Sequence, residues 1–208
     1  MKKMRFGKSC FAAVMFVVFA MILTGCIGGT SKPSKFYLLR SMDDSQKSLP
    51  PAGNKDSVSV LIGPISLPAY LDRTQMVTVV GKHELVLDEF NRWGEPLKDN
   101  FYRVLMEDLS LLLYTSDVYA YDREGATTAD YQVVIDITRF DSVPGGDALL
   151  TAFWTVSGKD KTTPSITRKS VFRAPVSATG FPGIVDAQNQ TLTAFSREIA
   201  AAIKLLQH

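Results

Sequence analysis

The chain has 208 residues, which is enough for one ordinary domain with a single apolar core. Its formal net charge is +2, but four of the 23 basic residues lie within the first eight positions, where there is no acidic residue. The other basic residues form no concentrated patch, so composition argues against a protein that binds nucleic acid.

The N-terminal region has the organisation of a bacterial secretion signal. Its basic first eight residues precede an almost wholly apolar run over 11–23, shorter than the roughly 20 residues that a spanning helix needs. The run ends in Leu23-Thr24-Gly25-Cys26, which resembles a bacterial lipobox, where a cysteine thiol accepts a diacylglyceryl group. We therefore predict that residues 1–25 are a signal peptide and that Cys26 is the lipid attachment site. The alternatives are an ordinary cleaved signal, or an N-terminal anchor helix with an incidental cysteine.

Processing before Cys26 changes the charge, the cysteine content and the expected location. The remaining 183 residues carry 19 basic and 21 acidic side chains, a net charge of −2. Cys10 is lost with the signal and Cys26 is acylated, so no intramolecular disulfide is expected. Residue 27 is Ile rather than the Asp that retains lipoproteins in the inner membrane. We therefore expect a lipid-anchored protein on the periplasmic face of the outer membrane, if the organism has one.

The mature chain divides into a tether and one domain. Residues 26–35 are predicted to be the lipidated cysteine and a flexible tether, because Gly, Ser, Thr, Lys and Pro dominate them. Residues 36–208 are predicted to form the domain. Alternating or continuous apolar patterns predict strands at 36–39, 58–62, 76–80, 85–87, 118–121, 131–138, 148–157 and 170–176. Gly63-Pro64 is expected to end the second strand, and Gly81-Lys82 to form a hairpin turn.

Two segments have helical periodicity. Residues 95–113 place apolar side chains on one face and polar ones, Asp108 among them, on the other, with Pro96 in the first turn. The second helix is predicted over 186–206, with Asp186 as its N-cap. The expected fold is α/β (α+β-like): a single domain with a mixed, largely antiparallel sheet packed with two main amphipathic helices.

No catalytic, cofactor or metal motif stands out. The histidines are His83, beside a predicted turn, and the terminal His208, and neither belongs to a metal-binding pattern. The acidic pairs Asp43-Asp44 and Asp88-Glu89 fit a solvated loop and a strand end better than acid–base catalysis. We therefore predict no catalytic residue, no metal and no cofactor beyond the lipid on Cys26.

One family resemblance covers most of the mature chain. The stretch from Val60 to Arg73, with Gly63-Pro64, Leu67-Pro68 and Tyr70-Leu71, resembles the ABC-type transport auxiliary lipoproteins, a family that includes paraquat-inducible protein C. Residues 36–39, 90–97, 104–113 and 131–154 are similar to the family's first strand, the start of its first helix, the helix itself and a long hairpin. The tether and residues 41–57 and 159–169 match nothing in particular.

The resemblance implies a non-catalytic subunit of an intermembrane lipid-transport system. Its implied partners are an MCE-domain protein, which forms a hydrophobic conduit across the periplasm, and an integral membrane transport component. The auxiliary lipoprotein would receive that conduit at the outer membrane, and self-association into a homo-oligomeric ring fits this role.

The candidate partner interface follows from the same stretch. Each residue also has a simpler interpretation: the prolines shape a loop, Tyr70 and Leu71 pack in the core, Arg73 forms an internal ion pair and Trp93 packs at a helix start. The candidate set is Pro64, Pro68, Tyr70, Leu71, Arg73 and Trp93. Two other functions stay open: a stand-alone periplasmic ligand- or lipid-binding lipoprotein with an apolar pocket between helices and sheet, and a periplasmic hydrolase.

Overall fold

The computed structural model describes residues 15, 32–42, 57–121, 129–160 and 164–207. Residues Ser34–His208 form one compact unit. The predicted signal peptide other than Met15, together with Cys26, Asp43-Asp44 and His208, lies outside the described residues. Among the described helices, none combines the length and the hydropathy that crossing a membrane requires.

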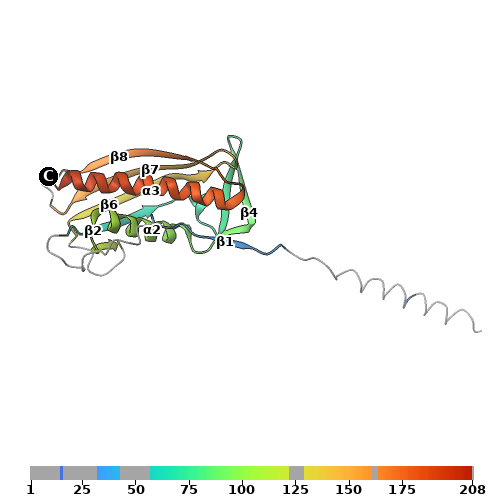
Figure 1. The fold of residues 1–208 in the computed structure, drawn as a ribbon, viewed down its shortest axis with the longest axis horizontal. Helices are drawn as coiled ribbons and strands as arrows, with labels where there is room; N and C mark the ends of the chain where they lie inside the picture. The colour runs from blue at the N-terminus through green and yellow to red at the C-terminus, as the bar shows by residue number, and fades with distance from the viewer. Residues whose placement is uncertain (1–14, 16–31, 43–56, 122–128, 161–163, 208) are drawn as a thin grey trace, which may run out of the picture. The chain divides into compact units, whose positions relative to one another are not determined.

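A five-stranded mixed sheet forms the larger part of the domain (Figure 1). Its strand order is β5 (Val118–Ala120), β2 (Val60–Ser66), β6 (Tyr131–Ser142), β7 (Asp147–Gly158) and β8 (Ile166–Pro175). Strand β2 runs parallel to both β5 and β6, whereas β6, β7 and β8 are successively antiparallel. The predicted α/β class with a mixed, largely antiparallel sheet is therefore confirmed.

A separate three-stranded sheet joins β1 (Lys35–Tyr37), β4 (Glu84–Trp93) and β3 (Gln75–Val80). Strands β3 and β4 form the predicted hairpin, and Gly81 supplies its turn with a φ of 62°. Strand β4 runs well beyond the predicted strand at 85–87 because Asn91, Arg92 and Trp93 pair in parallel with β1. That pairing joins segments more than 50 residues apart in the sequence, so no local sequence pattern predicts it.

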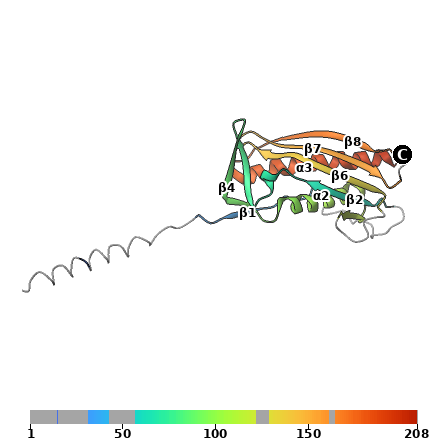
Figure 2. The same ribbon diagram turned by 180° about the vertical axis from the view of Figure 1, so that it is seen from behind.

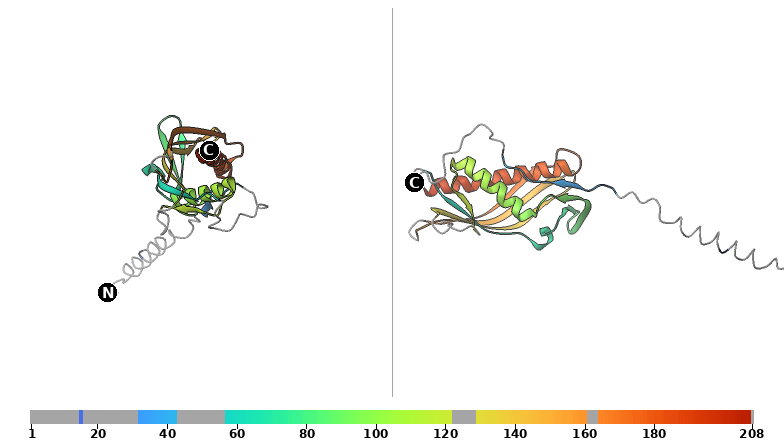
Figure 3. Two further views of the ribbon diagram at one scale, coloured as in Figure 1. Left: turned by 90° about the vertical axis from the view of Figure 1, so that its left-hand side faces the viewer. Right: turned by 90° about the horizontal axis from the view of Figure 1, so that it is seen from below.

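Helices α2 (Leu97–Leu113) and α3 (Gly180–Leu206) pack side by side on one face of the five-stranded sheet (Figure 3). Helix α3 lies in front of the strands in Figure 1 and behind them in Figure 2. The expectation that Asp186 caps α3 is wrong, since the helix begins at Gly180 after Thr179. This first turn contains Gly180, Pro182 and Gly183, which are poor helix formers, so the sequence pattern did not predict it. Proline is nevertheless tolerated in the first turn of a helix.

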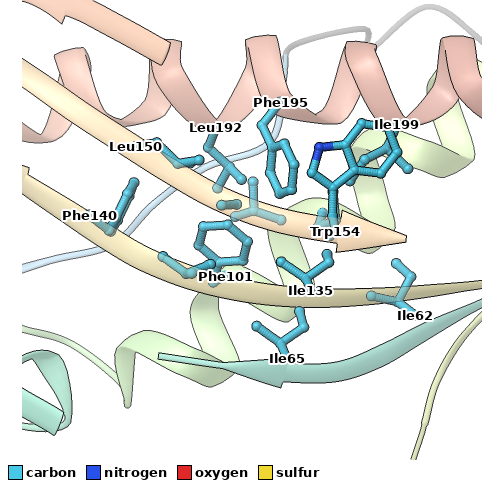
Figure 4. Close-up of a cluster of buried hydrophobic side chains, with 14 of the residues drawn as sticks. Ile62, Ile65, Phe101, Ile135, Phe140, Leu150, Trp154, Leu192, Phe195 and Ile199 are labelled. Carbon is cyan, nitrogen blue, oxygen red and sulfur yellow. The ribbon is translucent and has the colours of Figure 1, made fainter. Parts of the chain in front are cut away.

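Aliphatic and aromatic side chains together fill the space between helices and sheet (Figure 4). The rings of Phe101 and Phe140 meet edge to face, with centroids 5.6 Å apart, and those of Trp154 and Phe195 with centroids 6.3 Å apart. The buried Trp154 Nε1 donates to Ser170 Oγ at 3.0 Å. Burying each such side chain contributes about 1.5–3 kcal/mol, so this layer is a main source of stability.

Asp108 departs from the predicted pattern of α2. It was assigned to the polar side, but it is fully buried between α2 and α3. Its carboxylate accepts hydrogen bonds from Met42 N at 2.8 Å and from Ser196 Oγ at 2.7 Å. Burial raises the pKa of Asp108 above its ordinary value, and these two hydrogen bonds act in the opposite direction. Periodicity alone could not reveal partners contributed by two distant segments.

Candidate partner-docking site

The predicted docking segment, residues 63–73, begins inside strand β2. The expectation that Gly63-Pro64 ends the strand is wrong: β2 continues to Ser66 past a register shift between Ile62 and Ile65. The Gly63–Pro64 peptide bond is cis, and Gly63 has a φ of 114°. Side chains replace the missing ladder bonds, because Gln132 Nε2 donates to Gly63 O at 3.0 Å and Ile65 N donates to the Tyr102 hydroxyl oxygen at 3.1 Å.

The close approach of Tyr102 restricts position 63 to glycine. A Cβ at Gly63 would overlap the Tyr102 hydroxyl and would crowd Tyr121 Cβ at 2.9 Å. The positive φ adds strain for any other residue. The sequence Gly63-Pro64 therefore makes a bulge that fits against α2.

Pro64 is exposed and lies on the wall of a groove of about 580 Å³ beside α2. Its other lining residues come from one face of α2 and the end of β5: Lys98, Asp99, Tyr102, Arg103, Met106, Glu107, Ala120 and Tyr121. Arg103 binds Glu95 at 2.7 Å and Glu107 at 3.6 Å, and the Glu95 hydrogen bond raises the pKa of the guanidinium. The groove combines apolar surface from Pro64, Tyr102 and Met106 with charged side chains.

The second half of the docking segment is held by β6. Pro68 O accepts from Leu71 N at 2.9 Å at the short 3-10 helix η2 (Ala69–Leu71). The Tyr70 hydroxyl donates to Asp141 Oδ2 at 3.0 Å, and Arg139 Nη2 binds Oδ1 of the same carboxylate at 2.9 Å. Burial, followed by the Asp141 charge, raises the pKa of Tyr70 well above its ordinary value, so the hydroxyl stays a hydrogen-bond donor.

The cluster formed by Tyr70, Arg139 and Asp141 lies on the sheet face away from the helices. Neighbouring residues of a strand point to opposite faces, and Phe140 points toward α2, where it meets Phe101. Asp141, and Tyr70 bound to it, therefore lie on the other side of the sheet. Asp141 is only 4% exposed, so the segment covers that carboxylate.

The six candidate residues do not form one continuous surface. Pro64 and Arg73 are exposed, and Pro68 and Tyr70 are half-buried. Leu71 and Trp93 are only 3% and 5% exposed and belong to the core. They position the segment instead, with Trp93 N donating to Thr74 O at 2.8 Å. Of the six candidates, Pro68, Tyr70 and Arg73 therefore keep exposed surface near η2, while Pro64 belongs to the groove beside α2.

The sequence pattern did not point to Asn100, which binds the segment that follows β1. Its Oδ1 accepts from Leu39 N at 2.6 Å, and its Nδ2 donates to Leu39 O at 3.1 Å. Asn100 and Leu39 are both fully buried. An amide at a position of α2 next to the apolar Phe101 and Leu97 was the available signal, because a buried polar group needs partners.

Among residues 15, 32–42, 57–121, 129–160 and 164–207, no cluster of three or more His, Cys, Asp or Glu is placed to hold a metal ion. His83 is exposed at the turn between β3 and β4.

A scan of protein-family models matches residues 37–200 to the ABC-type transport auxiliary lipoprotein component family. The chain belongs to this family. Two crystal structures share its fold at 17% sequence identity each. One, of an uncharacterized protein, has a TM-score of 0.65 and covers 83% of this chain and 99% of its own. The other, a Xanthomonas campestris protein described under the family model DUF330, has a TM-score of 0.59 and covers 75% and 92%. No curated protein matches the sequence.

Family membership gives the coarse function. The protein is an auxiliary lipoprotein component of ABC-type transport, associated with a membrane of the cell envelope, and its role involves transport partners. The family description names no catalytic activity.

Proposed function

We propose that the protein is the non-catalytic outer-membrane lipoprotein subunit of an MCE-type intermembrane lipid-transport system. It docks the periplasmic conduit at the outer membrane, and a homo-oligomeric ring of the lipoprotein receives it. The observation that carries the proposal is the family match over residues 37–200 in a chain with a lipobox at Cys26. Ile27, at the position where Asp would retain a lipoprotein in the inner membrane, supports an outer-membrane location.

The structure supports a docking role through its surface. Aliphatic and aromatic side chains fill the helix–sheet interface, so a partner would bind outside it. Pro68, Tyr70 and Arg73 lie on a segment anchored by Leu71 in the core and by the Tyr70–Asp141 hydrogen bond. Such a rigid segment loses little conformational freedom on binding, and Tyr and Arg are the side chains that most often dominate interface energies.

Cross-linking of the full lipoprotein in native membranes, with affinity recovery and mass spectrometry, tests the proposal. We expect recovery of an MCE-domain protein, an integral membrane component and multimers of the lipoprotein. Arg73→Glu should reduce recovery of the MCE-domain protein several-fold. Lys204→Glu, an equal change of charge at an exposed position of α3, should leave it unchanged. Recovery of the lipoprotein alone, as a monomer, contradicts the proposal.

One observation favours the stand-alone ligand-binding alternative. The groove of about 580 Å³ beside α2 falls in the usual size range of small-molecule sites, about 300–1,000 Å³. Native mass spectrometry of the purified lipoprotein distinguishes the two functions. A bound small molecule that is lost in Met106→Glu, on a monomer without protein partners, supports the alternative.

A further inference from the structure

The three-stranded sheet carries a concentration of exposed apolar side chains. In the described part of 34–207, half of the large apolar residues that are exposed lie on this sheet or directly after β1. They are Phe36, Val80, Leu85, Val86, Leu87 and Phe90, with Leu38 next to them, and we call this group the apolar sheet surface. Phe36 is 66% exposed, and Leu85, Val86 and Leu87 are each 40% exposed. Gatherings of this kind mark contacts with proteins or membranes.

The exposed side chains occur on both faces of the β3–β4 hairpin. Leu85 and Leu87 pair with Val79 and Val77, whereas Val86 between them pairs with Thr78. Because side chains alternate along a strand, Val86 points away from the face that carries Leu85 and Leu87. A folded partner covers one face of a hairpin, whereas lipid headgroups and acyl chains surround both.

The chain connectivity limits the distance between this surface and the predicted lipid. Lys35, the first residue of β1, follows Cys26 by nine residues, which span at most about 30 Å when fully extended. Strand β4 lies beside β1, with Phe36 paired to Arg92, and paired strands are about 4.8 Å apart. The two hydrogen bonds between Asn100 and Leu39 hold the chain in place just after β1. The membrane that holds Cys26 is thus within reach of this sheet.

We propose that the apolar sheet surface lies in the headgroup layer of the membrane that carries the Cys26 lipid. The acyl chains hold the protein, and the sheet sets the orientation of the domain on the bilayer. Lys82 is exposed at the tip of the hairpin and is suited to lipid phosphates. This inference rests on lipidation of Cys26, which is part of the proposed function.

Site-directed spin labelling of the full lipoprotein provides the test. The chain contains only Cys10 and Cys26, one removed and the other acylated after processing, so an introduced cysteine is the single free thiol. Nitroxide labels at Phe36→Cys, Leu85→Cys and Val86→Cys are compared with Leu205→Cys. Leu205 is 64% exposed, which matches Phe36, but it lies at the C-terminal end of α3, away from β4 (Figure 1). Each variant is reconstituted into vesicles of phosphatidylethanolamine and phosphatidylglycerol, and its thermal unfolding is checked.

The ratio of nitroxide accessibility to oxygen over a water-soluble nickel chelate reports membrane depth. We expect this ratio at positions 36, 85 and 86 to be several-fold higher than at position 205. Equal ratios at all four positions overturn the inference, as does immobilisation of only one of the labels at 85 and 86, which indicates a protein or a second copy on one face. If the protein fails to float with the vesicles, lipid anchoring itself fails, and that outcome is distinct from anchored protein with labels in water.

Discussion

The two hydrogen bonds between the Asn100 side chain and the Leu39 backbone give the sharpest prediction for stability. Asn100→Leu keeps the size of the side chain but removes both its donor and its acceptor. Leu39 N and Leu39 O, both inside a fully buried residue, then have no side-chain partner. Each buried polar group left unpaired costs about 1–3 kcal/mol, so we expect a loss of about 3 kcal/mol in the free energy of unfolding. For a domain of this size that corresponds to a fall of about 6–12 °C in Tm.

The matched control is Asn189→Leu. Asn189 Oδ1 also accepts from a backbone N–H, that of Arg40 at 3.1 Å, but this hydrogen bond is exposed to water. Its loss should cost less than about 0.5 kcal/mol. Thermal unfolding gives the two stabilities, and amide hydrogen exchange should show rapid exchange at Leu39 in Asn100→Leu alone. Equal destabilisation by the two variants, or continued protection of the Leu39 amide, would refute the argument from burial.

Three further predictions follow from other positions. Gly63→Ala should destabilise the domain by clearly more than Gly81→Ala, because both glycines have positive φ but only Gly63 meets a neighbour, the Tyr102 hydroxyl; equal losses of Tm would contradict this. The raised pKa of Asp108 means that the folded state binds the proton more tightly than the unfolded chain, so this carboxylate lowers stability as pH rises from its ordinary value of 3.8 through the folded pKa. Asp108→Asn can still accept from Met42 N and can donate from its Nδ2 to Ser196 Oγ, so it should flatten the dependence of Tm on pH over that interval. Asp108→Ala should cost about 1–3 kcal/mol, and an unchanged pH profile in Asp108→Asn would count against the buried charge. Cys26→Ser should abolish incorporation of palmitate, measured by metabolic labelling, and continued incorporation would place the lipid elsewhere.

The sequence was most informative where structure is local. The two helices and the hairpin at Gly81 follow from periodicity and turn residues, strands β6 and β7 follow from the patterns at 131–138 and 148–157, and the structure confirms them. The first turn of α3 contains two glycines and a proline, which are poor local signals for a helix, and the full length of β4 depends on parallel pairing with β1. Such pairings are fixed by packing across the chain, which no short window of sequence contains.

The candidate site shows the same division. The stretch 63–73 could be singled out from its residues, but side-chain direction could not. From the sequence, Leu71 and Trp93 could be either interface or core residues, and the fold buries both. Tyr70 is fixed by Asp141 from a strand 71 residues later, and Asn100 by Leu39, 61 residues earlier in the segment after β1. Polar residues within apolar helix positions are the local sign of such long-range contacts.

Photo-cross-linking at position 73 in native membranes tests the central claim most directly. A photoreactive amino acid replaces Arg73, and a second variant carries it at Lys204 as the control. We predict an ultraviolet-dependent adduct between position 73 and an MCE-domain protein, in outer-membrane fractions, with none at position 204. Adducts at neither position, or equal adducts at both, in membranes where the lipoprotein and the MCE-domain protein are both present, would contradict docking through residues 63–73.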